Sequence, residues 1–117
     1  MEQETQTQRG IRLAREGKME EARAVFRDVI DDVPDDASVW CNYATTYLNE
    51  EDYVAALPYF EKAIELDPAF HGPYLSAGIC LTALGCHEDA LRLYDRALQV
   101  IPDNHEIWYN KAYTLME

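Results

Sequence analysis

Side chains of the types that bind metal ions occur together at one place, in the run Cys86, His87, Glu88 and Asp89. Adjacent residues on a helix point in different directions, so these four cannot easily converge on one ion. Their spacing also lacks the ligand pattern of a tetrahedral zinc site. The two acids are better suited to a helix N-terminus, where they interact favourably with the helix dipole. We therefore expect no metal and no cofactor.

Catalytic motifs are also missing from the sequence. It contains no H-E-x-x-H motif, no phosphate-binding loop and no G-x-S-x-G motif. Because no convergent acid, base and nucleophile can be nominated, the chain is not expected to be an enzyme.

The charge of the chain disfavours two classes of partner. Its 117 residues include 10 Lys and Arg against 22 Asp and Glu, for a net charge of −12. Nucleic acids and anionic membranes both attract basic surfaces, so neither is an expected partner. No apolar run approaches the roughly 18 residues that cross a bilayer. Three cysteines cannot close into a full set of disulfides, which favours reduced thiols and a cytoplasmic location.

Residues of similar type recur at an interval of 34, and this repeat must position any site. The ladders are Pro34, Pro68 and Pro102; Ala22, Ala56 and Ala90; Phe26, Phe60 and Tyr94; Trp40, Tyr74 and Trp108; and Ala44, Gly78 and Ala112. They define repeats over residues 3–36, 37–70 and 71–104, followed by residues 105–117. We expect one domain over 1–117.

Each repeat is predicted to form two helices. In the second, Trp40, Ala44 and Tyr47 recur at helical spacing, and another apolar stripe runs from Tyr53 to Ile64. The prolines of the ladder are expected to end each second helix. Two antiparallel helices approach closely only where facing side chains are small. The small residues expected to face each other are Ala22, Ala56 and Ala90 on one side and Gly10, Ala44 and Gly78 on the other, with large residues filling the space between hairpins.

The turn within each repeat has its own sequence pattern. Gly17 and Gly85 occupy a position where a positive φ is needed, and Asp52 is predicted to cap the helix after the second turn. Glu51 stands at the glycine position of that second turn. We therefore expect Asn49 or a looser turn to serve there.

This pattern resembles the tetratricopeptide repeat over nearly the whole chain. The best stretch runs from Trp40 through Tyr47, Ala56 and Phe60 to Pro68, whereas the first repeat departs most. The resemblance implies an all-α, right-handed superhelical stack of antiparallel helix hairpins with about seven helices. It also implies that the first helix of each pair lines a concave groove, where the family usually binds peptides.

The resemblance implies a set of groove residues on the first helices. The candidate peptide-binding residues are Cys41, Asn42, Thr45, Asn49, Leu75, Ser76, Ile79, Tyr109, Asn110 and Tyr113. Projecting the first helices onto their groove-facing side also places Glu4, Thr7, Gln8, Ile11, Arg15, Ser38, Thr82 and Glu106 on this surface. In related proteins an asparagine at the position of Asn42 and Asn110 can bond a peptide backbone, because a carboxamide both donates and accepts. The alternative for the asparagines is that they are simply solvated on an exposed helix face. The alternative for Leu75, Ile79, Tyr109 and Tyr113 is that they pack between helices.

A variant of the family binds a C-terminal carboxylate with Lys and Arg on three successive first helices. Here those positions hold Thr7, Ile11, Asn42, Gly72 and Ser76, and only Asn42 matches. The sequence therefore disfavours that carboxylate clamp, and a ligand with an apolar or mixed segment suits the groove better.

Two functions remain open. The first is a non-catalytic scaffold that binds a partner's peptide segment, with basic flanks drawn towards acidic turns and second helices. The second is a structural spacer, or a segment of a larger repeat protein that self-associates through its exposed terminal helix. Residues 105–117 are expected to be a capping helix or the start of a truncated repeat. The source of the acidity, including a halophilic one, is left open.

Overall fold

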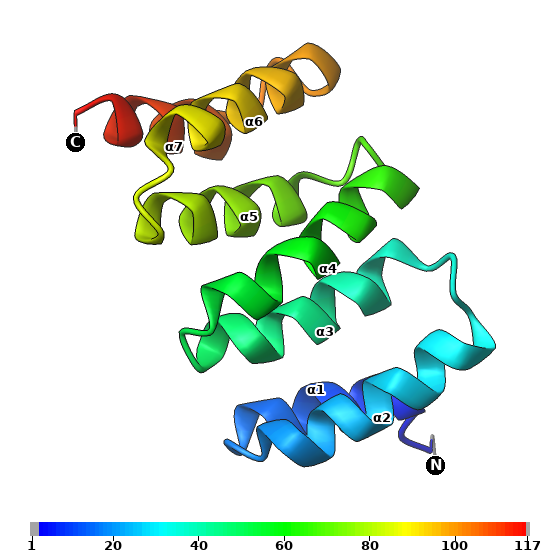
Figure 1. The fold of residues 1–117 in the computed structure, drawn as a ribbon. Helices are drawn as coiled ribbons and strands as arrows, with labels where there is room; N and C mark the ends of the chain where they lie inside the picture. The colour runs from blue at the N-terminus through cyan, green and yellow to red at the C-terminus, as the bar shows by residue number, and fades with distance from the viewer. Residues whose placement is uncertain (1–2, 117) are drawn as a thin grey trace.

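The computed structural model describes residues 3–116, and this part of the chain forms seven α-helices (Figure 1). They are α1 (Gln6–Arg15), α2 (Met19–Asp32), α3 (Ala37–Asn49), α4 (Tyr53–Leu66), α5 (His71–Ala83), α6 (His87–Val100) and α7 (His105–Leu115). Each helix packs on the next, so that α1–α2, α3–α4 and α5–α6 are hairpins and α7 closes the stack. The prediction of an all-α hairpin stack is confirmed. No helix within residues 3–116 is both long and apolar enough to cross a membrane.

The turns inside the three hairpins share one backbone conformation. Gly17 and Gly85 have φ values of 82° and 80°, as predicted. Glu51 also takes a positive φ, of 59°, so the expectation that Asn49 or a looser turn would serve is wrong. The N–H of Asp52 then donates to the Tyr47 carbonyl at 2.9 Å, just as the N–H of Cys86 bonds to that of Leu81 at 2.8 Å. The backbone hydrogen bonds of the turn therefore hold Glu51 in a conformation that glycine prefers.

Side chains form hydrogen bonds with the backbone both at the turns within hairpins and at the junctions between hairpins. Asp52 accepts the Ala55 N–H at 3.2 Å, which confirms the predicted cap of α4. The ladder prolines lie two residues beyond the ends of α2, α4 and α6. Their carbonyls accept hydrogen bonds from the large aromatic residues of the next helix: Trp40 Nε1 to Pro34 (2.7 Å), the Tyr74 hydroxyl to Pro68 (2.8 Å) and Trp108 Nε1 to Pro102 (2.8 Å). Two of the sequence ladders are thus parts of one junction.

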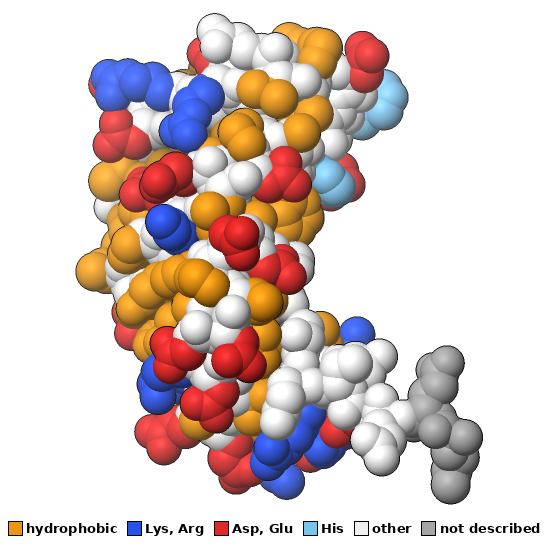
Figure 2. Space-filling view, turned by 90° about the vertical axis from the view of Figure 1, so that its right-hand side faces the viewer, with side chains coloured by type: hydrophobic (Ala, Val, Ile, Leu, Met, Phe, Trp, Pro, Cys, Tyr) orange, Lys and Arg blue, Asp and Glu red, His pale blue; other side chains and the backbone are white. Residues whose placement is uncertain are grey.

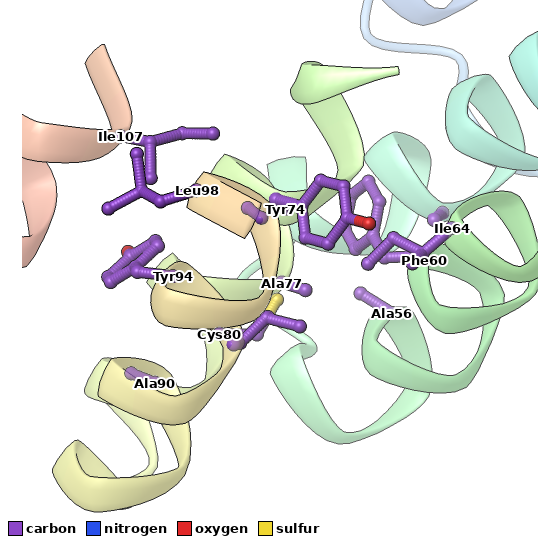
Figure 3. Packing of buried hydrophobic residues seen from close by; sticks show 13 residues of the cluster. Ala56, Phe60, Ile64, Tyr74, Ala77, Cys80, Ala90, Tyr94, Leu98 and Ile107 are labelled. Carbon is purple, nitrogen blue, oxygen red and sulfur yellow. The ribbon is translucent and has the colours of Figure 1, made fainter. Parts of the chain in front are cut away.

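Small residues face large aromatic rings inside a hairpin. A Cβ placed on Gly10 would lie 2.5 Å from the Phe26 ring, and one on Gly78 would lie 2.1 Å from the Tyr94 hydroxyl. Large residues were expected in the space between hairpins, and the rings of Phe26 and Tyr94 show that some of them also pack against the glycines of their own hairpins. Figure 3 shows Tyr94 and its neighbours in the main core, which spans α3 to α7.

A second, more polar cluster joins the first two hairpins. The Arg23 guanidinium of α2 pairs with Glu50, bonds to the Thr46 carbonyl and lies 4.5 Å from the centre of the Tyr47 ring. Its side chain is only 10% exposed. Sequence periodicity did not predict this contact, because Arg23 has no equivalent in the other repeats.

The curvature of the stack follows from which helices touch. The first helices contact one another in series, α1 with α3, α3 with α5 and α5 with α7. Within residues 3–116, no such contact joins α2 to α4 or α4 to α6. The row of first helices is therefore the inner row of a curved stack. Figure 2 shows the resulting crescent, hollowed on its right-hand side.

Candidate functional site

The ten predicted groove residues all lie on the inner row, on α3, α5 and α7. Ile79, Tyr109 and Tyr113 are 47%, 71% and 54% exposed, so about half or more of each side chain is accessible to solvent. Leu75 is half-buried and packs against the core. The concave side of the crescent in Figure 2 therefore carries accessible aromatic and aliphatic side chains.

One group of predicted residues surrounds a hollow between α1 and α3, which we call the N-terminal hollow. It has a volume of about 190 Å³ and is lined by Ile11, Ala14, Arg15, Phe26, Asn42, Thr45, Thr46 and Asn49. Asn42, Thr45 and Asn49 are candidate groove residues that the structure brings together around this hollow. Arg15 supplies the charge in this lining, which also includes the carboxamides of Asn42 and Asn49. This end of the groove therefore offers several hydrogen-bond donors.

A second group surrounds a hollow between α5 and α7, which we call the C-terminal hollow. It has a volume of about 280 Å³ and is lined by Ile79, Thr82, Ala83, Tyr94, Asn110, Tyr113 and Thr114. Ile79, Asn110 and Tyr113 were predicted groove residues. No charged side chain is among these lining residues, which distinguishes this hollow from the N-terminal one. Tyr109 lines a neighbouring shallow depression with His105, Glu106 and Asn110.

Tyr94 and Thr114 are part of the C-terminal hollow but were not among the predicted groove residues. Tyr94 comes from a second helix and reaches the inner row because Gly78 leaves room for its ring. Burial raises the pKa of Tyr94, while a hydrogen bond with Thr114 opposes this shift. The recurrence of a glycine sixteen residues before an aromatic ring, as in Gly10 and Phe26, is the sequence signal for this arrangement.

Cys41, Leu75 and Ser76 line neither hollow. Cys41 packs against the core, and burial raises the pKa of its thiol to about 11. The Thr45 hydroxyl donates to the Cys41 carbonyl at 2.8 Å. The thiol of Cys41 is therefore protonated and unreactive, because the thiolate is the reactive form. Cys41 serves as a small, weakly polar residue packed against the core. No group of three metal-binding side chains is arranged around one point in residues 3–116, and Cys86 to Asp89 form no such cluster.

Comparison with known families agrees with this architecture. One tetratricopeptide repeat model matches residues 7–69, and a second matches residues 47–112. The chain belongs to the tetratricopeptide repeat family. The matches overlap and together cover residues 7–112, which include all of the residues that line the N-terminal hollow.

Two curated relatives of this tetratricopeptide repeat chain are much longer proteins. It is 28% identical over 99 residues to the protein CTR9 homolog of Arabidopsis thaliana, which covers 84% of this chain and 9% of that protein. It is 30% identical over 100 residues to the Hsp70-Hsp90 organizing protein of Triticum aestivum, covering 86% of this chain and 17% of that protein. The chain spans less than a fifth of the length of either relative.

Solved tetratricopeptide repeat domains share the fold. The first such domain of Spaghetti (RPAP3), bound to the HSP90 peptide SRMEEVD, has a TM-score of 0.84 at 22% identity, covering 95% of this chain and 90% of that one. The second domain of human RPAP3, in complex with the HSP70 peptide SGPTIEEVD, has a TM-score of 0.85 at 24% identity, covering 96% and 93%. At these identities the likeness concerns the fold.

Proposed function

We propose that this chain is a non-catalytic interaction scaffold that binds an extended or helical peptide of a partner protein along its inner row of helices. The observation that carries the proposal is the grouping of predicted groove residues around two hollows on the concave side. The peptides bound to the two RPAP3 domains support the same use of the fold.

The side chains suggest how such a peptide is held. Asn42, Asn49 and Asn110 donate and accept hydrogen bonds with its backbone. Leu75, Ile79, Tyr109 and Tyr113 make apolar contacts with its side chains. Basic flanks of the peptide meet the acidic turns at the edges of the stack.

The chemistry of the groove separates this ligand from the acidic peptides bound by the two similar domains. The positions of the family's carboxylate clamp carry Thr7, Ile11, Asn42, Gly72 and Ser76 here, and none of these five residues is a Lys or Arg. We therefore propose an apolar or mixed segment rather than a terminal carboxylate as the part recognised.

A peptide array tests this proposal directly. The wild-type chain is expected to bind a subset of peptides rich in apolar residues. The double variant Asn42→Ala, Asn110→Ala is expected to bind them about tenfold more weakly, because each lost hydrogen bond weakens binding severalfold. Gln99→Ala, on the exposed side of α6, is the matched control and is expected to change nothing. Unchanged binding by the double variant would remove the asparagines from the mechanism, and a wild type that binds no peptide would contradict the function itself.

A second candidate function is a spacer that self-associates through α7. The observation that favours it is the exposure of Trp108 and Leu115, at 49% and 63%. Light scattering should then show a mass that rises with concentration, and Leu115→Glu should abolish the rise. A monomer at every concentration counts against it.

For either function, the three free cysteines support a reducing compartment such as the cytoplasm.

A further inference from the structure

One polar atom of the C-terminal hollow lacks a hydrogen-bond partner. The Thr82 hydroxyl is buried, and it has no donor or acceptor in the part of the chain that the structure describes. Two threonines of α3 behave differently, because Thr45 and Thr46 donate to carbonyls of their own helix at 2.8 and 2.6 Å. A buried hydroxyl without a partner is destabilising, and native structures hold few of them. The exception therefore points to a group that Thr82 meets when the groove is occupied.

The rest of the hollow describes that group. Ile79 and Tyr113 form open apolar walls, and Tyr94 is buried beneath them. No charge is present among the lining residues, so an ionised side chain would be desolvated without compensation. The volume of about 280 Å³ lies just below that of sites that enclose whole small molecules, about 300–1,000 Å³. The hollow therefore suits one large, uncharged side chain.

We propose that the C-terminal hollow binds a tyrosine side chain of the peptide ligand, and that Thr82 is the residue that recognises its hydroxyl. This inference rests on the peptide-binding function proposed above. The ring packs between Ile79 and Tyr113, and the carboxamide of Asn110 bonds to the peptide backbone beside it. Thr82 reaches the ligand by rotating about its Cα–Cβ bond, since threonine in a helix divides between two rotamers. The rotation exchanges an unpartnered hydroxyl for a paired one.

Two small probes test the pocket without any knowledge of the peptide. N-acetyl-tyrosine amide and N-acetyl-phenylalanine amide are titrated into the full chain, and the backbone NMR shifts of Ile79, Thr82, Asn110 and Tyr113 are followed. The tyrosine amide is expected to bind about fivefold more tightly, the usual gain from one hydrogen bond. Thr82→Val should bind both amides equally, with the phenylalanine affinity unchanged, whereas Thr82→Ser should keep the preference. Gln99→Ala, on the exposed side of α6, should behave as wild type.

Each other outcome overturns the inference. Equal affinities of the wild type for the two amides, a preference that survives in Thr82→Val, or shifts that arise outside the C-terminal hollow would each do so. The peptide array is a separate measurement. Peptides that bind the array without any preference for tyrosine would leave the scaffold function standing while removing the tyrosine pocket. A pocket that binds the tyrosine amide in a chain that binds no peptide would instead contradict the scaffold function.

Discussion

Glu51 is the non-glycine residue with a positive φ among residues 3–116. An L-residue in this conformation costs about 1–2 kcal/mol, a cost that glycine avoids. We therefore expect Glu51→Gly to raise the free energy of unfolding by about 1 kcal/mol, measured by urea denaturation. Within residues 3–116, the exposed Glu51 side chain makes no ion pair that the change would remove.

The equivalent glycines supply the control for this prediction. Gly17→Ala and Gly85→Ala place a Cβ at φ values of 82° and 80° in open space. Both should lower the free energy of unfolding by about 1 kcal/mol, through the backbone alone. If Glu51→Gly were neutral while both alanine variants were destabilising, a compensating role of the Glu51 side chain would be indicated.

The buried hydroxyl of Tyr74 makes the stability of the fold depend on pH. The hydroxyl donates to the Pro68 carbonyl at 2.8 Å, and burial raises the pKa of the phenol above its usual value near 10. A raised pKa in the folded state means that stability is complete below pH 10 and is lost as the pH rises through the folded pKa. Tyr74→Phe should be less stable by about 1 kcal/mol at pH 7. Its disadvantage should shrink above pH 10 in urea titrations at a series of pH values, and a constant difference would refute the linkage.

The close approach of α5 to α6 depends on the missing side chain of Gly78, which faces the Tyr94 ring. A Cβ there would lie 2.1 Å from the hydroxyl and 2.3 Å from the Cζ of Tyr94, and the rigid ring cannot move aside easily. Gly78→Ala should therefore destabilise the chain by about 1–3 kcal/mol through overpacking, despite the better helix propensity of alanine. Thermal unfolding followed by circular dichroism measures this.

Gly72 is the matched control in the same helix. A Cβ there would lie 3.4 Å from the Phe70 ring, an ordinary contact distance. Gly72→Ala is expected to leave the midpoint unchanged or to raise it by a few degrees. A large loss in Gly72→Ala would show that alanine is tolerated poorly throughout α5, and not only under the Tyr94 ring.

The helices and their order could be predicted from the 34-residue spacing, because each ladder residue has a structural task that recurs in every repeat. The spacing predicted turns at Gly17 and Gly85 and the cap at Asp52. It did not predict the conformation of Glu51, because the backbone hydrogen bonds of the turn outweigh the preference of one residue. The Arg23 contact was also missed, since a residue that occurs once leaves no periodic signal.

The candidate site was predictable only in part, for a related reason. Groove positions on the first helices follow from helical projection, which placed Asn42 and Asn110 beside hollows. The depth of a hollow depends instead on which residue of the neighbouring helix lies beneath it. Tyr94 takes that place through Gly78, a contact between residues sixteen positions apart that projection onto one helix cannot show.

At the scale of the whole molecule, stability is a sum of hairpins and of the contacts between them. Arg23 joins the first hairpin to the second through Glu50, Thr46 and Tyr47. Arg23→Ala should therefore speed amide hydrogen exchange throughout α1 and α2, while exchange in α5 to α7 stays unchanged. The global free energy of unfolding should fall by about 2–3 kcal/mol, as for a charged hydrogen-bonded group.

Arg92→Ala provides the comparison for this effect. Arg92 pairs with Glu88 and Asp89 of its own helix and is 73% exposed, so its loss should leave both exchange and stability nearly unchanged. Exchange that rises evenly along the chain in Arg23→Ala would mean that the stack unfolds as a single unit.

The one-sided contact between helices also has a mechanical meaning. Contacts in series along α1, α3, α5 and α7 resist compression, whereas α2, α4 and α6 have none of these contacts with one another in residues 3–116. Flattening the crescent separates the inner helices and breaks their contacts, while tightening it drives them into steric overlap. The inner row therefore contributes to the bending stiffness of the molecule, together with the packing of each second helix on the first helix that follows it. A ligand that contacts several inner helices at once restrains the distances between them, and the whole stack then bends less.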